Sequence, residues 1–207
     1  MLLDAPEVIV DDNHVYSEGG KACPRSVTGL LKRYGLSADL SQIPPRVLER
    51  ARQRGNAVDA GFRLIAQGIE IDPTSISPEI GNYLNAFSTF WRDSGAELIE
   101  SGLPRISPLG FGFCPDLIVF LNGRRTVIDG KATFKIPKSV GPQTAGYAIG
   151  WNSLYPTERI EDRAALWLKS DSSYKFVTLA DPDDERAFMD CLEADIKLEQ
   201  WRVKYGE

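Results

Sequence analysis

The chain has 207 residues, 43% of them hydrophobic and 26% charged, with a net charge of −5 at pH 7. This is an ordinary globular composition, and we expect one domain over residues 1–207. His14 is the single histidine, which excludes a Ser-His-Asp triad, a Cys-His pair and an H-E-x-x-H zinc site. Any catalysis must therefore depend on carboxylates, lysine and a metal ion.

The N-terminus and the cysteines point to a cytoplasmic protein. Residues 1–16 have neither a basic region nor a long apolar stretch, and no later run approaches the roughly eighteen apolar residues of a membrane span. The 3 cysteines, Cys23, Cys114 and Cys191, lie far apart. They fit a reducing compartment and exclude a four-cysteine zinc or iron–sulfur site. We expect no membrane partner.

Residues 1–45 are predicted to form a hairpin and a helix. Gly19 and Gly20 are typical of a tight β-turn. The helix that follows is predicted to begin after the capping residue Ser26 and to end at Gly35.

Two longer helices come next. Helical spacing over residues 44–68 predicts one apolar side, made up of Val47, Leu48, Ala51, Val58, Phe62 and Ile65. A second helix is predicted over residues 77–95, with Ser77 as its cap and Pro78 in its first turn.

The pattern then changes to strands. Residues 96–107 predict one strand, and residues 112–134 predict a hairpin around Asn122-Gly123, where both turn residues need a positive φ. The hairpin is apolar on both faces, which indicates a sheet that is covered on both sides.

This hairpin brings three charged residues together. If Leu121 faces Arg124, then Asp116 lies opposite Asp129, and strand alternation puts Lys131 on the same face. Two carboxylates facing each other across a ladder repel, and a divalent cation would offset this repulsion. The alternative is that both aspartates are solvated residues at strand ends.

The last third of the chain predicts a helix, a hairpin and a final helix. In residues 141–155, Gln143, Tyr147, Trp151 and Tyr155 recur every four positions and so share one face. Residues 163–181 predict a second hairpin, and Asp181-Pro182 opens a C-terminal helix over residues 181–207. We therefore predict an α/β fold whose central mixed sheet has helices on both faces.

Charge is distributed unevenly. Residues 181–207 carry the whole net charge, whereas residues 124–138 and 46–54 are locally basic. Such patches are expected of a protein that binds nucleic acid, although the arginines of residues 46–54 also fit a solvated helix face.

An ordered set of motifs resembles a known superfamily. In chain order the set consists of RGNAVDAG, ESGLPRISPLGFGFCPD with Pro115-Asp116 at its end, Asp129-Gly130-Lys131, and Gln143-x-x-x-Tyr147. It resembles the motifs of the PD-(D/E)xK nucleases, and within them the RecB-like and phage-exonuclease group. The resemblance covers about residues 46–155 and implies a restriction-endonuclease-like core.

The resemblance also implies roles for individual residues. Asp116, Asp129 and the Gly130 carbonyl match the ligands of one or two Mg²⁺ or Mn²⁺ ions, and Glu100 matches an outer or additional carboxylate. Lys131 matches the lysine that orients the attacking water.

Other positions of the motifs match residues expected to bind DNA or a metal. Gln143 and Tyr147 match residues that contact a phosphate or an end nucleotide, and they also fit a core-facing stripe. Lys135, Lys138 and Arg54 are expected to bind DNA. Where the group has a metal-binding histidine this chain has Asp59, which fits either an all-oxygen site or an ordinary exposed helix residue.

The function expected from this resemblance is a Mg²⁺- or Mn²⁺-dependent exonuclease acting on DNA ends in recombination or repair, encoded by a phage. The alternatives are an inactive DNA-binding module of the same fold and a structure-specific endonuclease. A homo-oligomer and a single-strand annealing or recombination protein are the protein partners that the resemblance leaves open.

Overall fold

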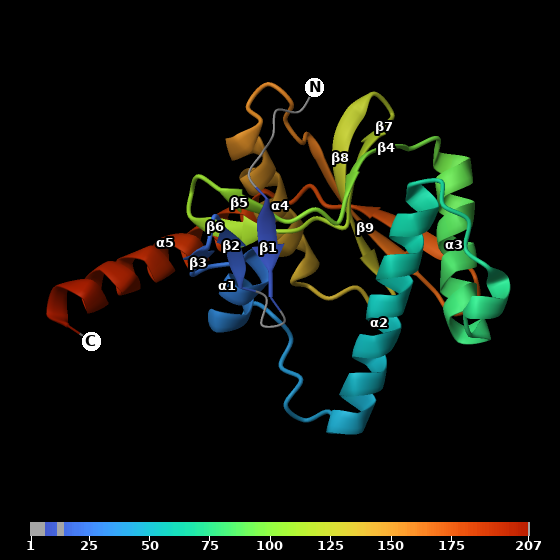
Figure 1. Cartoon of the computed structure of the whole chain (residues 1–207), viewed down its shortest axis with the longest axis horizontal. Coiled ribbons are helices and arrows are strands. Elements are labelled where there is room, and N and C mark those ends of the chain that lie inside the picture. The colour runs from blue at the N-terminus through green and yellow to red at the C-terminus, as the bar shows by residue number, and fades with distance from the viewer. Residues whose placement is uncertain (1–6, 12–14, 207) are drawn as a thin grey trace.

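A five-stranded mixed sheet forms the centre of the protein in the computed structural model, which describes residues 7–11 and 15–206 (Figure 1). His14 lies outside the described residues. The strands of this sheet are β4 (Glu97–Ser101), β7 (Leu117–Leu121), β8 (Arg124–Lys131), β9 (Asp162–Leu168) and β10 (Tyr174–Thr178). Their order is β10-β9-β8-β7-β4, and the pairing is antiparallel throughout except between β8 and β9, which are parallel.

Helices cover both faces of the sheet, as the sequence predicted. The helices of the described residues are α1 (Val27–Arg33), α2 (Pro45–Ala66), α3 (Pro78–Ser94), α4 (Val140–Leu154) and α5 (Pro182–Tyr205), with a short 3₁₀ turn, η1 (Pro73–Ser75). One core lies between the sheet and α2 and α3, and the other lies between the sheet and α1, α4 and α5 (Figure 1). None of the described helices is long and apolar enough to cross a membrane.

The central hairpin has the predicted turn and register. Asn122 and Gly123 have φ values of 51° and 79°, and Leu121 pairs with Arg124. Strands β7 and β8 are buried on both faces over most of their length, which confirms that the sheet is covered on both sides.

The prediction of one strand over residues 96–107 is wrong. This segment forms β4 and a separate strand, β5 (Arg105–Ser107), which pairs with β6 (Phe111–Phe113) in a small sheet of its own. The chain turns between them at Gly102, whose φ of 60° favours glycine. The break therefore comes from a backbone turn that the apolar pattern did not reveal.

The N-terminal region forms a small three-stranded sheet. Its strands are β1 (Val8–Val10), β2 (Tyr16–Glu18) and β3 (Lys21–Cys23). The predicted turn at Gly19 and Gly20 joins β2 to β3, and β1 adds a strand that the sequence did not predict. The Ser26 side chain caps α1 by accepting a hydrogen bond from the Gly29 amide.

Helix α2 packs on the sheet through its second half only. Val58 and Phe62 are almost fully buried, whereas Val47 is 58% exposed. Val47 belongs to the predicted apolar side but does not reach the core, because the first turns of the helix extend past the sheet (Figure 1).

A buried ion pair attaches the N-terminal region to α5. The side chains of Arg25 and Asp195 are each 7% exposed, and Arg25 Nε donates to Asp195 Oδ2 at 2.9 Å. Asp195 also accepts hydrogen bonds from Arg33 and Tyr34, and Arg25 makes a second ion pair with Glu199. Residues about 170 positions apart in the chain are thereby held together.

We predict that Asp195→Ala lowers the free energy of unfolding by about 3 kcal/mol, because it leaves a buried guanidinium with a single, half-exposed partner. Urea denaturation measures this loss. Asp183→Ala removes an exposed carboxylate of the same helix, in a pair with Arg186 whose side chains are more than 70% exposed, and should leave the midpoint unchanged. Equal midpoints for the two variants would contradict the prediction.

Candidate metal-binding carboxylate site

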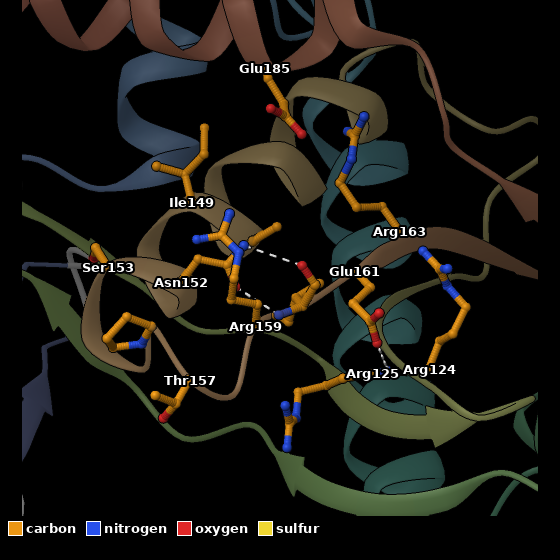
Figure 2. Close-up of a pocket in the computed structure, with 13 residues that line it drawn as sticks. Arg124, Arg125, Ile149, Asn152, Ser153, Thr157, Arg159, Glu161, Arg163 and Glu185 are labelled. Carbon is orange, nitrogen blue, oxygen red and sulfur yellow. Dashed lines mark hydrogen bonds between the residues drawn. The ribbon is translucent and has the colours of Figure 1, made fainter.

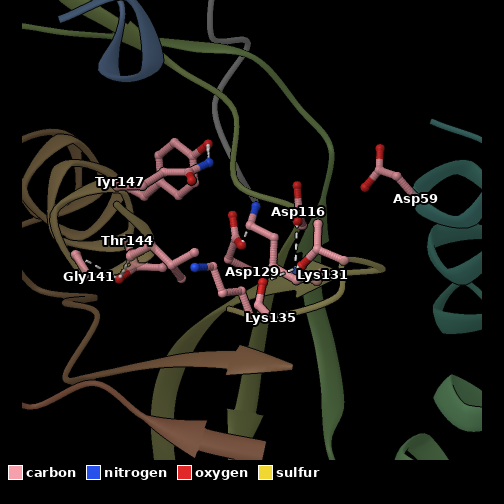
Figure 3. Close-up of polar contacts among 12 residues, drawn as sticks. Asp59, Asp116, Asp129, Lys131, Lys135, Gly141, Thr144 and Tyr147 are labelled. Atoms are coloured by element: carbon pink, nitrogen blue, oxygen red, sulfur yellow. Dashed lines mark hydrogen bonds and ion pairs between the residues drawn. The ribbon is translucent and has the colours of Figure 1, made fainter. Parts of the chain in front are cut away.

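The predicted acidic residues meet at the end of β8. Asp129 and Lys131 lie on the face of the sheet that α4 covers, and Asp116 directly precedes β7 (Figure 3). Strand β8 continues to Lys131 because it still pairs with β9 there, Asp129 with Ala165 and Lys131 with Trp167. The last pair between β7 and β8 is Leu117 with Ile128.

The sequence predicted that Asp116 lies opposite Asp129 in the ladder. In the structure the ladder ends one pair earlier, so Asp116 does not pair with Asp129. It lies just beyond the last pair, next to Pro115, which has no amide hydrogen to donate. Its carboxylate bends towards β8, where Oδ2 accepts a hydrogen bond from the Gly130 amide at 2.8 Å. The two carboxylates are still neighbours, held by a side-chain contact instead of strand register.

Asp129 is a carboxylate in an unusual environment. It is 0% exposed, and neither of its oxygens receives a well-aligned hydrogen bond from the described residues. Its one close cationic partner is Lys131, whose Nζ lies 2.5 Å from Oδ2. Buried carboxylates normally have several donors, so Asp129 has capacity for a further cationic partner.

Burial and neighbouring charges shift the pKa values of this pair. Burial raises the pKa of Asp129 to about 6, with Lys131 opposing the shift and Asp116 adding to it. Burial alone would lower the pKa of Lys131, but the carboxylates of Asp129 and Asp116 outweigh it and raise that pKa. Lys131 is therefore an ammonium group at neutral pH.

Gly130 leaves room for a core side chain beneath the site. A Cβ atom at this position would lie 2.6 Å from Cε1 of Phe62 on α2. The ring fits against the bare backbone between Asp129 and Lys131, so α2 approaches β8 directly below the carboxylates.

Arg63 links Asp59 to the site. Its Nη2 lies 2.8 Å from Asp59 Oδ2 and 3.4 Å from Asp116 Oδ1. Burial, followed by the nearby Asp116, raises the pKa of Asp59 to about 7 although Arg63 opposes the shift. In Figure 3, Asp59 lies on α2, apart from the other two carboxylates.

The oxygens fit a hard cation held by few protein ligands. No three carboxylate, thiol or imidazole side chains within the described residues come together as one metal-binding group. Mg²⁺ is commonly bound by one or two carboxylates, with water and phosphate oxygens filling its other positions. Asp116 and the underbonded Asp129, with the Gly130 carbonyl, are such a set, and the role of Asp59 as a further ligand stays a prediction.

Glu100, the expected outer or additional carboxylate, pairs with an arginine. It is buried on β4, and its Oε2 lies 2.5 Å from Nη2 of Arg105. Burial raises the pKa of Glu100, and Arg105 opposes this. Since Arg105 occupies one oxygen, metal binding by Glu100 stays a prediction.

The two α4 residues of the motif contact each other. Gln143 Nε2 donates to the Tyr147 hydroxyl at 2.8 Å, and Tyr147 is only 5% exposed within the α4 core. Burial, then the nearby Asp129 and Asp116, raises the pKa of Tyr147 well above its usual value. Tyr147 thus packs behind Asp129 as part of the core, and contact of either residue with DNA stays a prediction.

Strand β8 separates the basic residues of segment 124–138 into two groups, one at each end of the strand. Arg124 and Arg125 lie at the hairpin end and pair with Asp162 and Glu158. Lys135 and Lys138 are exposed on the loop that follows Lys131. Only these two extend the site outwards.

Arg54 lies on α2, where its guanidinium is over the ring of Tyr83 and 3.4 Å from Glu79. It borders a cavity that Lys135 also lines. The two residues expected to bind DNA are thus brought to one surface by different elements.

A second cavity, of about 850 Å³, lies at the hairpin end of the sheet (Figure 2). Its wall includes Arg124, Arg125 and Arg163. Each of them already has a partner: Arg163, for example, donates to the Gly141 carbonyl and to Asp184. The acidic residues of the β8 end do not line this cavity, so we do not place the chemistry there.

Two residues at the site were missed by sequence reasoning. They are Arg63 and Gly102, where a Cβ atom would lie 2.1 Å from Nη1 of Arg63. Arg63 is four residues after Asp59 on a predicted helix, a spacing that places an arginine beside an aspartate and could have revealed it. Nothing in the sequence places Gly102 against the guanidinium.

We predict that Arg63→Gln strengthens the binding of Mg²⁺ or Mn²⁺ about tenfold, because it removes a positive charge next to Asp116. Isothermal titration calorimetry measures the affinity. Arg63→Lys keeps the charge and should bind the metal as the unmodified protein does. Weaker binding by Arg63→Gln would show instead that Arg63 holds Asp116 in position for the ion.

Comparison with known proteins gives a distant structural similarity. No family model matches the chain, and no curated protein matches it. The chain is similar to the crystal structure of an alkaline exonuclease (LHK-Exo) from Laribacter hongkongensis, with 16% sequence identity and a TM-score of 0.35, over 67% of this chain and 78% of that one. Similarity of this extent does not bear on function, which has to be argued from the site.

Proposed function

We propose that the protein is a Mg²⁺- or Mn²⁺-dependent deoxyribonuclease of the PD-(D/E)xK type. The observation that carries the proposal is the buried Asp129 carboxylate, which lacks well-aligned donors and lies beside Asp116 and the Lys131 ammonium. A structural ion pair would satisfy its own oxygens, whereas this arrangement is suited to a ligand that brings positive charge.

The local charge supports a cation. Three carboxylates, of Asp59, Asp116 and Asp129, are in contact with two cationic side chains, Arg63 and Lys131. When all three carboxylates are ionised, one negative charge is left at a mostly buried position, which is costly without a counter-ion; the raised pKa values of Asp59 and Asp129 reflect this cost. A divalent ion would reverse the sign and favour an approaching phosphate.

The residues have distinct roles in phosphodiester hydrolysis. Asp116, Asp129 and the Gly130 carbonyl would hold the ion, which when bound polarises the phosphate and lowers the pKa of water. Lys131 donates a hydrogen bond to the attacking water or to a phosphate oxygen, and its charge stabilises the transition state. The Gly130 amide positions Asp116 by donating to one oxygen of that carboxylate, and the Arg63 guanidinium lies 3.4 Å from the other oxygen.

The proposed substrate is DNA, which would bind to the site by one of its ends. Arg54 and Lys135 line one cavity, and Lys138 is exposed on the loop that follows Lys131, so all three side chains can pair with phosphates. The choice of an exonuclease in recombination or repair, and of a phage as its source, follows from the sequence resemblance. Cleavage of ends alone would separate it from a structure-specific endonuclease.

The test uses end-labelled linear, circular and single-stranded DNA, each with and without Mg²⁺ or Mn²⁺. We expect metal-dependent loss of linear DNA and survival of covalently closed circles. DNA binding without any cleavage would identify an inactive module of the same fold and overturn the proposal.

We predict that Asp129→Ala and Lys131→Ala each lower the turnover of linear DNA by at least about 100-fold, because each removes charge at the reacting phosphate. The release of labelled nucleotides measures this. The matched control is Lys175→Ala, which removes an exposed lysine of β10 and should keep full activity. Circular dichroism checks that the variants are folded; full turnover by either site variant would rule out the assignment.

We predict that the double variant Lys135→Ala/Lys138→Ala binds all DNA sequences more weakly and reduces the slope of log K against log [salt] by up to about 1.8, since each phosphate contact contributes about 0.9. Fluorescence anisotropy in EDTA measures binding without cleavage. Lys175→Ala/Lys197→Ala removes two other exposed lysines and should keep the slope. If the Lys135→Ala/Lys138→Ala variant also keeps the salt slope of the unmodified protein, the loop after β8 does not touch the DNA backbone.

A further inference from the structure

A cavity of about 660 Å³ lies beside the carboxylate site, between the β8–α4 loop and helices α2 and α3. Its wall combines cationic and aromatic side chains, chief among them Arg54, Tyr83, Phe134, Trp167 and Lys169. Basic side chains alternating with aromatic rings are the usual surface for single-stranded nucleic acid.

The cavity is continuous with the end of β8. Trp167 on β9 is the strand partner of Lys131, which places their Cα atoms about 4.8 Å apart. The Trp167 indole Nε1 donates to the Thr133 carbonyl at 2.7 Å, so the loop after Lys131 is tied to this wall. Phe134 is the next residue of that loop. A chain bound in the cavity would therefore lead directly to Lys131.

Two of the three rings are already covered by cations. The guanidinium of Arg54 lies 5.9 Å from the centre of the Tyr83 ring, and Lys169 Nζ lies 5.2 Å from the centre of the Trp167 ring. These contacts hold the charges inside the cavity wall. Phe134 is different, because it is 96% exposed.

The exposed Phe134 ring lacks a structural explanation in the fold. Phenylalanine is among the residues most often buried in folded proteins, and the cores on both sides of the sheet do not include Phe134. Its position three residues after Lys131 makes it available to a substrate.

The charges of the wall suit a polyanion. Arg54 and Lys169 face one acidic residue of the cavity, Asp171, whose Oδ1 accepts hydrogen bonds from the amide and hydroxyl of Ser173. Arg54 also pairs with Glu79, but at 3.4 Å and with both side chains partly exposed, a contact that binds weakly. Both cations remain available for phosphates.

We propose that this cavity binds an unpaired segment of DNA, with one base stacked on Phe134 and the flanking phosphates paired with Arg54 and Lys169. The inference rests on the proposed nuclease function, since that function is the reason for a DNA strand to lie beside Lys131. It deepens that function by selecting single-stranded DNA, or a frayed end, over a fully paired duplex. In a duplex the faces of internal bases are covered by their neighbours, whereas an unpaired base offers its face to a ring.

The experiment measures binding and cleavage in the same proteins. Fluorescence anisotropy in EDTA gives the affinity for a labelled single strand and for a blunt duplex of equal length. We expect tighter binding of the single strand by the unmodified protein, and we expect Phe134→Ala to weaken that binding about 5- to 150-fold, the range of one base–aromatic stack. The duplex affinity should change little.

Two further variants control the result. Phe134→Trp keeps a flat ring, so it should bind the single strand as tightly as the unmodified protein. Phe120→Ala removes another exposed phenylalanine, 45% exposed on β7 close to the hairpin turn and far from Lys131 along the sheet, and should have no effect. Equal affinity of the unmodified protein for single strand and duplex, or unchanged binding by Phe134→Ala, would overturn the inference.

A parallel cleavage assay keeps this inference separate from the proposed function. If the unmodified protein binds the single strand through Phe134 but cleaves no DNA with Mg²⁺ or Mn²⁺, the nuclease assignment fails and the binding cavity stands. If it cleaves DNA while Phe134→Ala binds and cleaves single strands normally, the nuclease assignment stands and the cavity does not bind the strand.

Discussion

The arrangement of the site depends on β8 being longer than its pairing with β7. Up to Ile128, β8 has a partner on both sides; beyond that residue only the parallel partner β9 continues. The free side of the strand end is where Asp116 reaches the Gly130 amide. Because β9 and α4 still cover this end, Asp129 is buried there although it lies near the edge of the ladder. A shorter β8 would leave Asp129 solvated, and a longer β7 would carry Asp116 away from Gly130.

Several elements of the fold supply the groups that offset the repulsion between the carboxylates of the site. Lys131 comes from the same strand as Asp129, whereas Arg63 comes from α2 and contacts Asp116 across the gap between helix and sheet. Phe62 and Gly130 set how closely α2 can approach. The carboxylates are thus held by packing that is completed only when the helix layer has docked, so the electrostatics of the site depend on the hydrophobic core below it.

Local signals predicted most of the fold. The Asn122-Gly123 turn, the caps Ser26, Ser77 and Asp181, and the two-sided apolar hairpin act within a few residues, and each has its predicted effect. The register counted from the hairpin turn also predicted that Asp116, Asp129 and Lys131 lie close together. The failures concern long-range contacts. The chain turns at Gly102, where a Cβ atom would clash with Arg63, and the first half of α2 extends past the sheet and stays exposed. Such contacts join distant segments, and no periodicity within one segment encodes them.

The net negative charge of the protein is concentrated in one helix, α5. Residues 181–207 carry the whole net charge of −5, and the Arg25–Asp195 pair helps to fix this helix to the α1 side, across the sheet from the arginine-bearing α2 (Figure 1). The protein is therefore an electric dipole: its acidic pole is α5, and its basic pole is formed by α2 and the loop after β8. In the field of a polyanion such a dipole experiences a torque that turns α5 away, so a protein with net negative charge can still turn one chosen face towards that polyanion before any contact forms.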